Sequence, residues 1–239
     1  MGYKLTWAYI GQQKIRPTNW TPWANTVGYW KLDWDLTDEM GSYNGTVTSN
    51  ATVSYESLPW DASVKCAKVY SNNWGYWISL PASIWNERWT QQTSLTFATF
   101  MKLTENYIAC LLYWLAPGSW VTSNIVYSNT DGLWLWLWAN GSENDDFVAY
   151  TLNTGTWYSV VWTYDHTTRA KSYYVNWALV WTVIAQNDYN TSSSPTSAFL
   201  ARVNHNTCLS NAVFETNTVW DATTVQLFHN TFKSLYGLS

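Results

Sequence analysis

Residues 156–182 read TWYSVVWTYDHTTRAKSYYVNWALVWT, and this stretch decides the fold class. Residues 157–164 and Ala170–Val175 are rich in Val, Tyr and Trp, which are favoured in strands, and a polar segment at 165–168 separates them. The stretch therefore predicts two antiparallel strands joined by a turn. Residues 176–181 predict a second turn that leads into another short strand.

The same pattern extends outward along the chain. Residues 94–103 (SLTFATFMKL) alternate between apolar and polar positions, and residues 107–115 form the continuous apolar run typical of a strand covered on both faces. Residues 225–228 and 232–236 predict two final strands, and no stretch of a dozen residues shows a helical period. We predict an N-terminal strand and connector at 1–25, followed by an all-β, two-sheet antiparallel sandwich at 26–239.

Composition excludes several classes of protein. The chain has 239 residues, which suits one sandwich domain, and its formal net charge is −4. Only 12% of the residues are charged and Lys and Arg form no runs, so we expect no nucleic-acid partner. No apolar run is long enough for a membrane helix and no secretion signal is evident, so we expect no membrane insertion.

Two segments carry a family resemblance. Residues 29–46 (YWKLDWDLTDEMGSYNGT) and the hairpin at 156–182 resemble laminin-G-like modules of the concanavalin A-like superfamily, and 67–81 and 213–236 resemble them more loosely. The resemblance spans about residues 27–237. It implies a jelly-roll sandwich, an adhesive role in binding glycans or proteins, and in some members a Ca²⁺ ion on the rim.

Tryptophan is unusually abundant, with 20 residues against only 11 glycines. Trp177 follows Asn176 where a tight hairpin favours Asn-Gly, and the resemblance expects a small residue at Trp34 and Trp181. Three explanations remain open: an aromatic binding platform, plain core packing, or glycine codons (UGA) read as tryptophan. Reassigning fourteen tryptophans, Trp162 and Trp220 among them, would change glycine from 11 to 25 residues and tryptophan from 20 to 6, ordinary values for a turn-rich β protein. This third explanation expects several of these side chains at turns or in solvent, whereas Trp30 and Trp157 match family aromatics and should be buried.

One acidic segment is a candidate metal site. Asp33, Asp38 and Asn44, with Asp35 and Glu39 between them, supply the oxygen ligands that Ca²⁺ prefers. The alternative is that these side chains accept hydrogen bonds from the backbone of turns. Calcium is the only cofactor that the sequence predicts.

Catalytic and redox motifs are scarce. A glycosidase needs two carboxylates that flank the scissile bond, and the paired acids of concanavalin A-like glucanases are missing from the sequence. His166, His205 and His229 show neither metal-ligand spacing nor an evident Ser or Cys partner. Cys66, Cys110 and Cys208 form no recognisable framework, and any one pair could bridge. We therefore predict that the protein is not an enzyme.

The predicted function is carbohydrate binding or adhesion, as a module of a bacterial surface protein or a phage tail-like structure. Candidate ligand contacts that do not depend on tryptophan are Tyr113, Tyr127 and Asn140. The expected partner is a glycan or cell-surface polysaccharide, with protein partners in a larger assembly, and the expected location is extracellular, on a cell surface or on a virion. The alternatives are a purely structural sandwich without a ligand and a divergent glycoside hydrolase.

Overall fold

The computed structural model describes residues 9–10, 13–14, 22–48, 51–59, 61–70, 78–84, 93–105, 109–115, 122–128, 132–139, 142–185, 197–203 and 207–239. Within these residues the regular structure is β-strand, apart from one α-helix and two short 3-10 helices, η1 (Ala82–Ile84) and η2 (Lys233–Tyr236). The predicted all-β class is thus confirmed, with one helical exception near the C-terminus.

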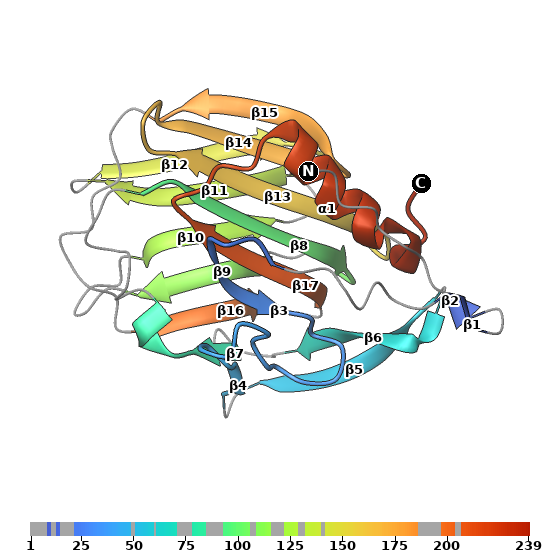
Figure 1. The fold of residues 1–239 in the computed structure, drawn as a ribbon. Helices are drawn as coiled ribbons and strands as arrows, with labels where there is room; N and C mark the ends of the chain where they lie inside the picture. Colours follow the sequence, from blue (N-terminus) through green and yellow to red (C-terminus); the bar gives the residue numbers. More distant parts are fainter. Residues whose placement is uncertain are drawn as a thin grey trace.

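The larger sheet has eight strands, all paired antiparallel. Seven of them follow one another across the sheet and the eighth, β3, pairs beside them with β17 (Figure 1). In spatial order they are β15 (Ala178–Ile184), β14 (Ala170–Val175), β13 (Trp157–Asp165), β8 (Leu95–Leu103), β17 (Thr207–Thr216), β6 (Asp61–Tyr70) and β5 (Thr52–Leu58), with β3 at Thr26–Trp30.

The smaller sheet has seven antiparallel strands. In spatial order they are β12 (Ser142–Ala149), β11 (Gly132–Ala139), β10 (Thr122–Ser128), β9 (Ala109–Leu115), β16 (Ser197–Val203), β7 (Ile78–Leu80) and β4 (Thr46–Val47). A separate two-stranded sheet joins β1 (Tyr9–Ile10) to β2 (Gln13–Lys14), and the sandwich begins with β3 at Thr26. The domain division between residues 25 and 26 stays a prediction.

The hairpin that decided the fold class forms as predicted. Strands β13 and β14 pair in register from Val160 opposite Val175 to Asp165 opposite Ala170. Asn176 and Trp177 then turn the chain into β15 with backbone φ angles of 46° and 68°. Two consecutive positive φ angles between antiparallel strands are the conformation of a type I′ turn, which favours Asn-Gly. A tryptophan therefore occupies a position that favours glycine.

The space between the two sheets holds the main hydrophobic core. Large aromatic side chains from several strands of the larger sheet fill it, among them Trp30, Trp162, Tyr173 and Phe214, all buried. Leu133 and Val148, which pair across β11 and β12, close the core from the smaller sheet. Phe97 and Met101 of β8 face this core, whereas Ala98 and Phe100 face the opposite side of the sheet and are buried there. The prediction of a single apolar face for residues 94–103 is therefore wrong.

The predicted strands at 225–228 and 232–236 are wrong, because this segment forms helix α1 (Ala222–Phe232) and the 3-10 turn η2. The Asp221 side chain caps the helix by accepting a hydrogen bond of 2.7 Å from the Thr224 backbone N–H. Val225, Phe228 and Phe232 follow at helical spacing and are buried. In the part of the chain that the structure describes, no helix is long and apolar enough to cross a membrane.

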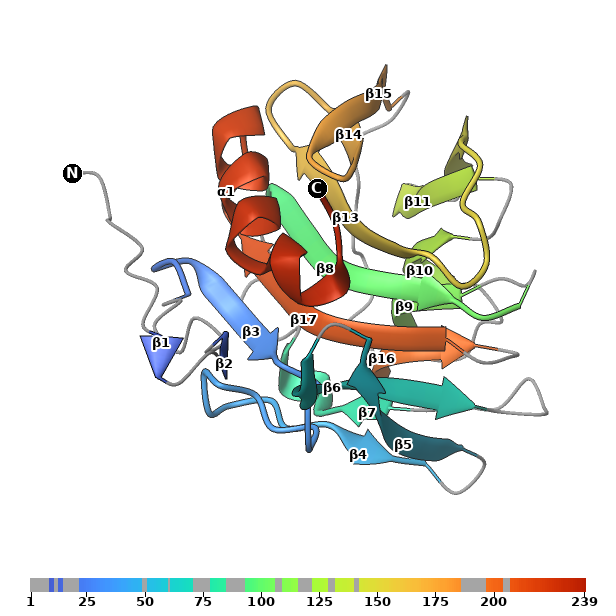
Figure 2. The same ribbon diagram turned by 90° about the vertical axis from the view of Figure 1, so that its right-hand side faces the viewer.

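Helix α1 creates a second core. It lies on the outer face of the larger sheet, opposite the seven-stranded sheet (Figure 2). Phe100 and Trp157 of the sheet contact Tyr236, with ring centroids 4.3 and 4.7 Å away, and Phe100 also contacts Phe228 of the helix at 5.3 Å. The central strands of the larger sheet are therefore covered on both faces, which explains why every residue of β17 is buried.

The tryptophans divide into two groups. Trp30 and Trp157 are buried, as expected for authentic residues. Trp34, Trp177 and Trp181 leave 61%, 45% and 49% of their surfaces exposed, which fits both the binding-platform and the misread-codon explanations. The core-packing explanation fits Trp162 and Trp220, which lie in the interior, and the Trp220 indole N–H donates a 2.7 Å hydrogen bond to Glu215.

Candidate functional site

The candidate site is built on the loop at residues 31–45, which connects β3 to β4. Buried side chains anchor both ends of the loop, because Leu32 and Tyr43 pack in the main core. The Trp30 indole N–H also donates a hydrogen bond of 2.9 Å to the Tyr43 backbone carbonyl. Because these anchors hold the loop against the sandwich, its polar side chains project from a fixed base.

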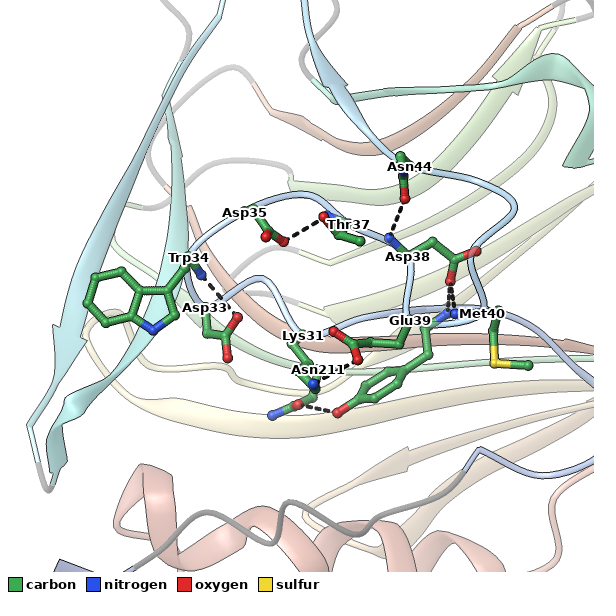
Figure 3. A network of polar contacts seen from close by, with 11 residues as sticks. Lys31, Asp33, Trp34, Asp35, Thr37, Asp38, Glu39, Met40, Asn44 and Asn211 are labelled. Atoms are coloured by element: carbon green, nitrogen blue, oxygen red, sulfur yellow. Dashed lines mark hydrogen bonds and ion pairs between the residues drawn. The ribbon is translucent and has the colours of Figure 1, made fainter.

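Asp38 organises the interior of this loop (Figure 3). Its buried carboxylate accepts hydrogen bonds from four backbone N–H groups at 2.9–3.2 Å, two on each oxygen. The donors are Tyr29, Met40, Ser42 and Tyr43. The Asn44 side-chain oxygen adds a further hydrogen bond within the loop, because it accepts from the Asp38 backbone N–H at 2.9 Å.

These contacts bear on the predicted calcium ligands. The structure brings Asp38 and Asn44 together, whereas Asp33 accepts a separate hydrogen bond from the Trp34 backbone N–H at 3.0 Å. Over the described residues, no group of three or more His, Cys, Asp or Glu side chains is placed to hold a metal ion. In the structure these side chains accept hydrogen bonds from the backbone of the loop, which is the alternative that the sequence left open. Calcium binding stays a prediction.

An exposed aromatic and charged surface lies beside the loop, and we call it the Trp34 patch. It comprises Asp33, Trp34 and Asp35 of the loop, Tyr55 of β5 and Lys65 of β6. The Lys65 ammonium lies 5.1 Å from the centroid of the Trp34 ring, within the range of a cation–π contact. Burial raises the pKa of the Tyr55 hydroxyl, and the nearby negative charges of Asp35 and Asp33 raise it further.

The Trp34 patch has the chemistry of a shallow binding surface. An exposed indole offers a flat apolar face, while carboxylates, a phenol and an ammonium group offer hydrogen-bond acceptors and donors around it. Asp33 and Asp35 each accept a hydrogen bond from the loop backbone, which fixes their orientation (Figure 3). Sequence reasoning noted Trp34 and the acids separately and missed the patch, because Tyr55 and Lys65 lie on strands that only the fold brings beside the loop.

The predicted ligand residues fall elsewhere. Tyr113 lies on β9 and Tyr127 on the neighbouring strand β10, where the register pairs them with Ile125 and Cys110 respectively. Their side chains lie outside the described part of the structure, as does all of Asn140. Their role in ligand binding stays a prediction.

His229 has a serine partner, contrary to the sequence-based expectation. The Ser159 hydroxyl lies 2.8 Å from Nδ1 of His229, and both residues are buried where α1 meets β13. Burial lowers the pKa of His229 to about 4, and the positive charge of Lys233 adds to this. The expectation was wrong because the two residues are 70 positions apart. Sealed between helix and sheet, the pair holds α1 in place and is poorly placed to act on a substrate.

Comparisons with known proteins support the fold. No family model and no curated protein matches the sequence. Among solved structures, the binding domain of botulinum neurotoxin DC in complex with rat synaptotagmin II matches 87% of this chain and 51% of its own, with a TM-score of 0.60 and 14% identity. The same domain in complex with SialylT matches 87% of this chain and 52% of its own (TM-score 0.58, 14% identity).

A third similar structure is of botulinum neurotoxin type C, which depends on interaction with two ganglioside molecules to enter cells. It matches 87% of this chain and 51% of its own, with a TM-score of 0.60 and 14% identity. The chain thus spans about half the length of these matched structures. At such identity the likeness concerns the fold, and it confirms the predicted antiparallel β-sandwich.

Proposed function

We propose that this protein is a non-catalytic carbohydrate-binding module whose ligand contacts the Trp34 patch. The observation that carries the proposal is the 61% exposed Trp34 ring, flanked by Asp33, Asp35, Tyr55 and Lys65. The structural similarity to toxin binding domains, of which some are described with SialylT or gangliosides, supports it at the level of the fold.

The chemistry of the patch suits a sugar. The apolar C–H face of a pyranose ring stacks on an aromatic side chain, while its hydroxyls donate to carboxylates such as those of Asp33 and Asp35. Lys65 and Tyr55 supply donors to ring or hydroxyl oxygens of the same sugar. Loops fixed on a rigid sandwich are a common position for such sites. The surface is open, so we expect modest affinity and tolerance of large polysaccharides.

The biological setting that we propose follows the predicted function. The module would belong to a bacterial surface protein or a phage tail-like structure, act outside the cell or on a virion, and bind a cell-surface polysaccharide. Because the calcium site at Asp33, Asp38 and Asn44 is still a prediction, binding should be measured both with added Ca²⁺ and with a chelator.

A glycan array followed by titration calorimetry tests the proposal. We expect a saturable isotherm for at least one glycan class and loss of binding in the variants Trp34→Gly and Asp33→Asn. Trp181→Gly is the matched control, because Trp181 is a similarly exposed tryptophan on β15, outside the patch. Silence across broad glycan classes, or binding that Trp34→Gly leaves intact, would refute the proposed site.

A second candidate function is assembly, and a specific feature of β15 favours it. This strand forms one edge of the larger sheet, carries no charged residue, and exposes Leu179 and Ile184 by 55% each. Edge strands of monomeric proteins usually carry charges, prolines or bulges that prevent pairing with other chains. Strand β15 has one register shift, between Leu179 and Trp181, but it has neither a charge nor a proline. Because β15 is uncharged, two copies of this chain can bring their β15 edges together without repulsion.

Light scattering during size-exclusion chromatography separates this candidate from the first. Assembly through β15 predicts a dimer that the variant Leu179→Lys converts to a monomer, while glycan binding is unchanged. A monomeric protein at high micromolar concentration would exclude the second candidate.

A further inference from the structure

Cys66 and Cys208 lie on neighbouring strands of the larger sheet. Cys208 of β17 pairs with Lys68 of β6, and the next pair along the strands is Leu209 with Ala67. The antiparallel register thus places Cys66 two residues from Lys68, on the same face of the sheet as Cys208 and diagonally across from it. Both thiols are buried in the second core, and each shifts the pKa of the other.

Cys110 is a poor partner for either thiol. It lies on β9 in the other sheet, where its backbone pairs with Tyr127 and Arg202. Packed sheets lie about 10 Å apart, whereas the Cα atoms of a disulfide are usually within about 7 Å of each other. Of the three pairings that the sequence left open, the fold therefore selects Cys66 with Cys208.

The surroundings of the pair distinguish the two thiols. The hydrogen bond from Cys66 lowers the pKa of Cys208, and the positive charge of Lys102 acts in the same direction. The same hydrogen bond and burial raise the pKa of Cys66. Glu56 lies 3.9 Å from the Cys208 sulfur and forms a 2.6 Å ion pair with Lys68. Burial and the Glu56 carboxylate oppose this lowering of the pKa of Cys208.

We propose that Cys66 and Cys208 form a disulfide between β6 and β17 when the protein folds in contact with a small-molecule disulfide oxidant such as oxidised glutathione. The thiolate of one cysteine attacks one sulfur of the oxidant, the oxidant's sulfur–sulfur bond breaks, and one glutathione thiolate leaves. The thiolate of the other cysteine then attacks the sulfur of the first and displaces the second glutathione. Two electrons pass from the two cysteines to the oxidant, and the two thiol protons end on the released glutathione thiolates.

The bond would join segments that are far apart in the sequence. It closes a loop of roughly 140 residues, and cross-links over loops of this size stabilise by restricting the unfolded chain. Because the second core covers both sulfurs, oxidation belongs to the folding step, and the finished bond is shielded from external reductants. This inference concerns the scaffold and does not depend on the proposed glycan site.

The experiment refolds the full chain in a glutathione redox buffer and, separately, under full reduction. Thiols are then counted under denaturing conditions, and non-reduced peptides are mapped by mass spectrometry. We expect one free thiol, at Cys110, after oxidative refolding and a peptide that links Cys66 to Cys208, against three free thiols in the reduced protein. The oxidised form should melt about 10 °C higher.

Variants sharpen the result. Cys110→Ser should leave the linked peptide and the higher melting temperature unchanged, whereas Cys66→Ser should lose both. Peptide mapping of the unmodified chain does not depend on the variants folding. Three free thiols after oxidative refolding, or a linked peptide that contains Cys110, would overturn the proposal.

Discussion

The hydrogen bonds of Asp38 give the most specific prediction. In the variant Asp38→Asn, one side-chain oxygen can still accept from Tyr29 and Met40, but the new amide N–H₂ group faces the backbone donors of Ser42 and Tyr43. Ser42 is exposed and can bind water, while Tyr43 is buried and cannot. Hydrogen bonds to a charged group contribute about 1.5–3 kcal/mol each, and a buried donor left unpaired costs a similar amount.

We therefore expect Asp38→Asn to lower the free energy of unfolding by about 3 kcal/mol. Urea denaturation followed by circular dichroism measures this as a lower midpoint with an unchanged m-value. The matched control is Asp35→Asn, because Asp35 is exposed and accepts a hydrogen bond from the Thr37 backbone N–H at the surface. This change should alter stability by less than about 0.5 kcal/mol.

The same measurement in the presence of a chelator separates the turn role from the metal role. Because the stabilisation arises from the four backbone donors, the loss in Asp38→Asn should be equal with a chelator and with added Ca²⁺. A loss below about 1 kcal/mol, or one seen only with added Ca²⁺, would refute the reasoning.

Three further predictions concern buried and exposed side chains. The pKa of His229 in the folded protein is about 4, below its ordinary value of 6.5, so between these pH values only the unfolded chain binds the proton. The free energy of unfolding should therefore fall by up to about 3 kcal/mol as the pH decreases, and urea titrations from pH 7 to 4 should show a smaller fall in the variant His229→Gln. Trp220→Gly should lower the free energy of unfolding by about 3–5 kcal/mol in thermal unfolding, because Trp220 is buried and hydrogen-bonded to Glu215. If Trp220→Gly and Trp34→Gly lowered stability equally little, the core role of Trp220 would be contradicted. Trp177→Gly should leave the stability unchanged, because glycine avoids the cost of a left-handed backbone conformation, about 1–2 kcal/mol, and this offsets the lost packing of the half-exposed ring. A clear loss of stability in the same assay would show that the ring is needed there.

The misread-codon explanation also makes a direct prediction. Under this explanation the gene carries UGA at Trp34, Trp177 and Trp181, and protein isolated from its natural host has glycine at these positions by peptide mass. That result would remove the Trp34 ring and exclude the proposed binding site, which requires UGG at Trp34. Of the fourteen reassigned tryptophans, Trp162 and Trp220 lie in the interior, and this burial favours genuine tryptophan at these two positions. UGG codons at the three exposed positions would end this explanation and leave the exposed rings as candidates for binding.

Local pattern was sufficient for the class of fold. The alternation at 94–103 and the residues favoured in strands at 157–175 indicated which segments are strands, and Asn176 marked the hairpin turn. Strand geometry and turn conformation depend on residues a few positions apart, so local sequence records them. The same reasoning missed α1. Its apolar residues are few and interrupted by Thr, Gln and Asn, and its helical spacing has meaning only once the outer face of the larger sheet is there to receive it.

The sequence by itself determined that this chain forms an antiparallel sandwich and that the loop around Asp38 is rich in turn-forming acids. Only the tertiary structure decided which distant side chains meet: Tyr55 and Lys65 at Trp34, Ser159 at His229, and Cys66 at Cys208. The physical reason is that periodicity records which face of a strand is apolar, whereas strand order depends on how all the faces are buried together. Contacts between residues about 20 to about 140 positions apart follow from that collective packing.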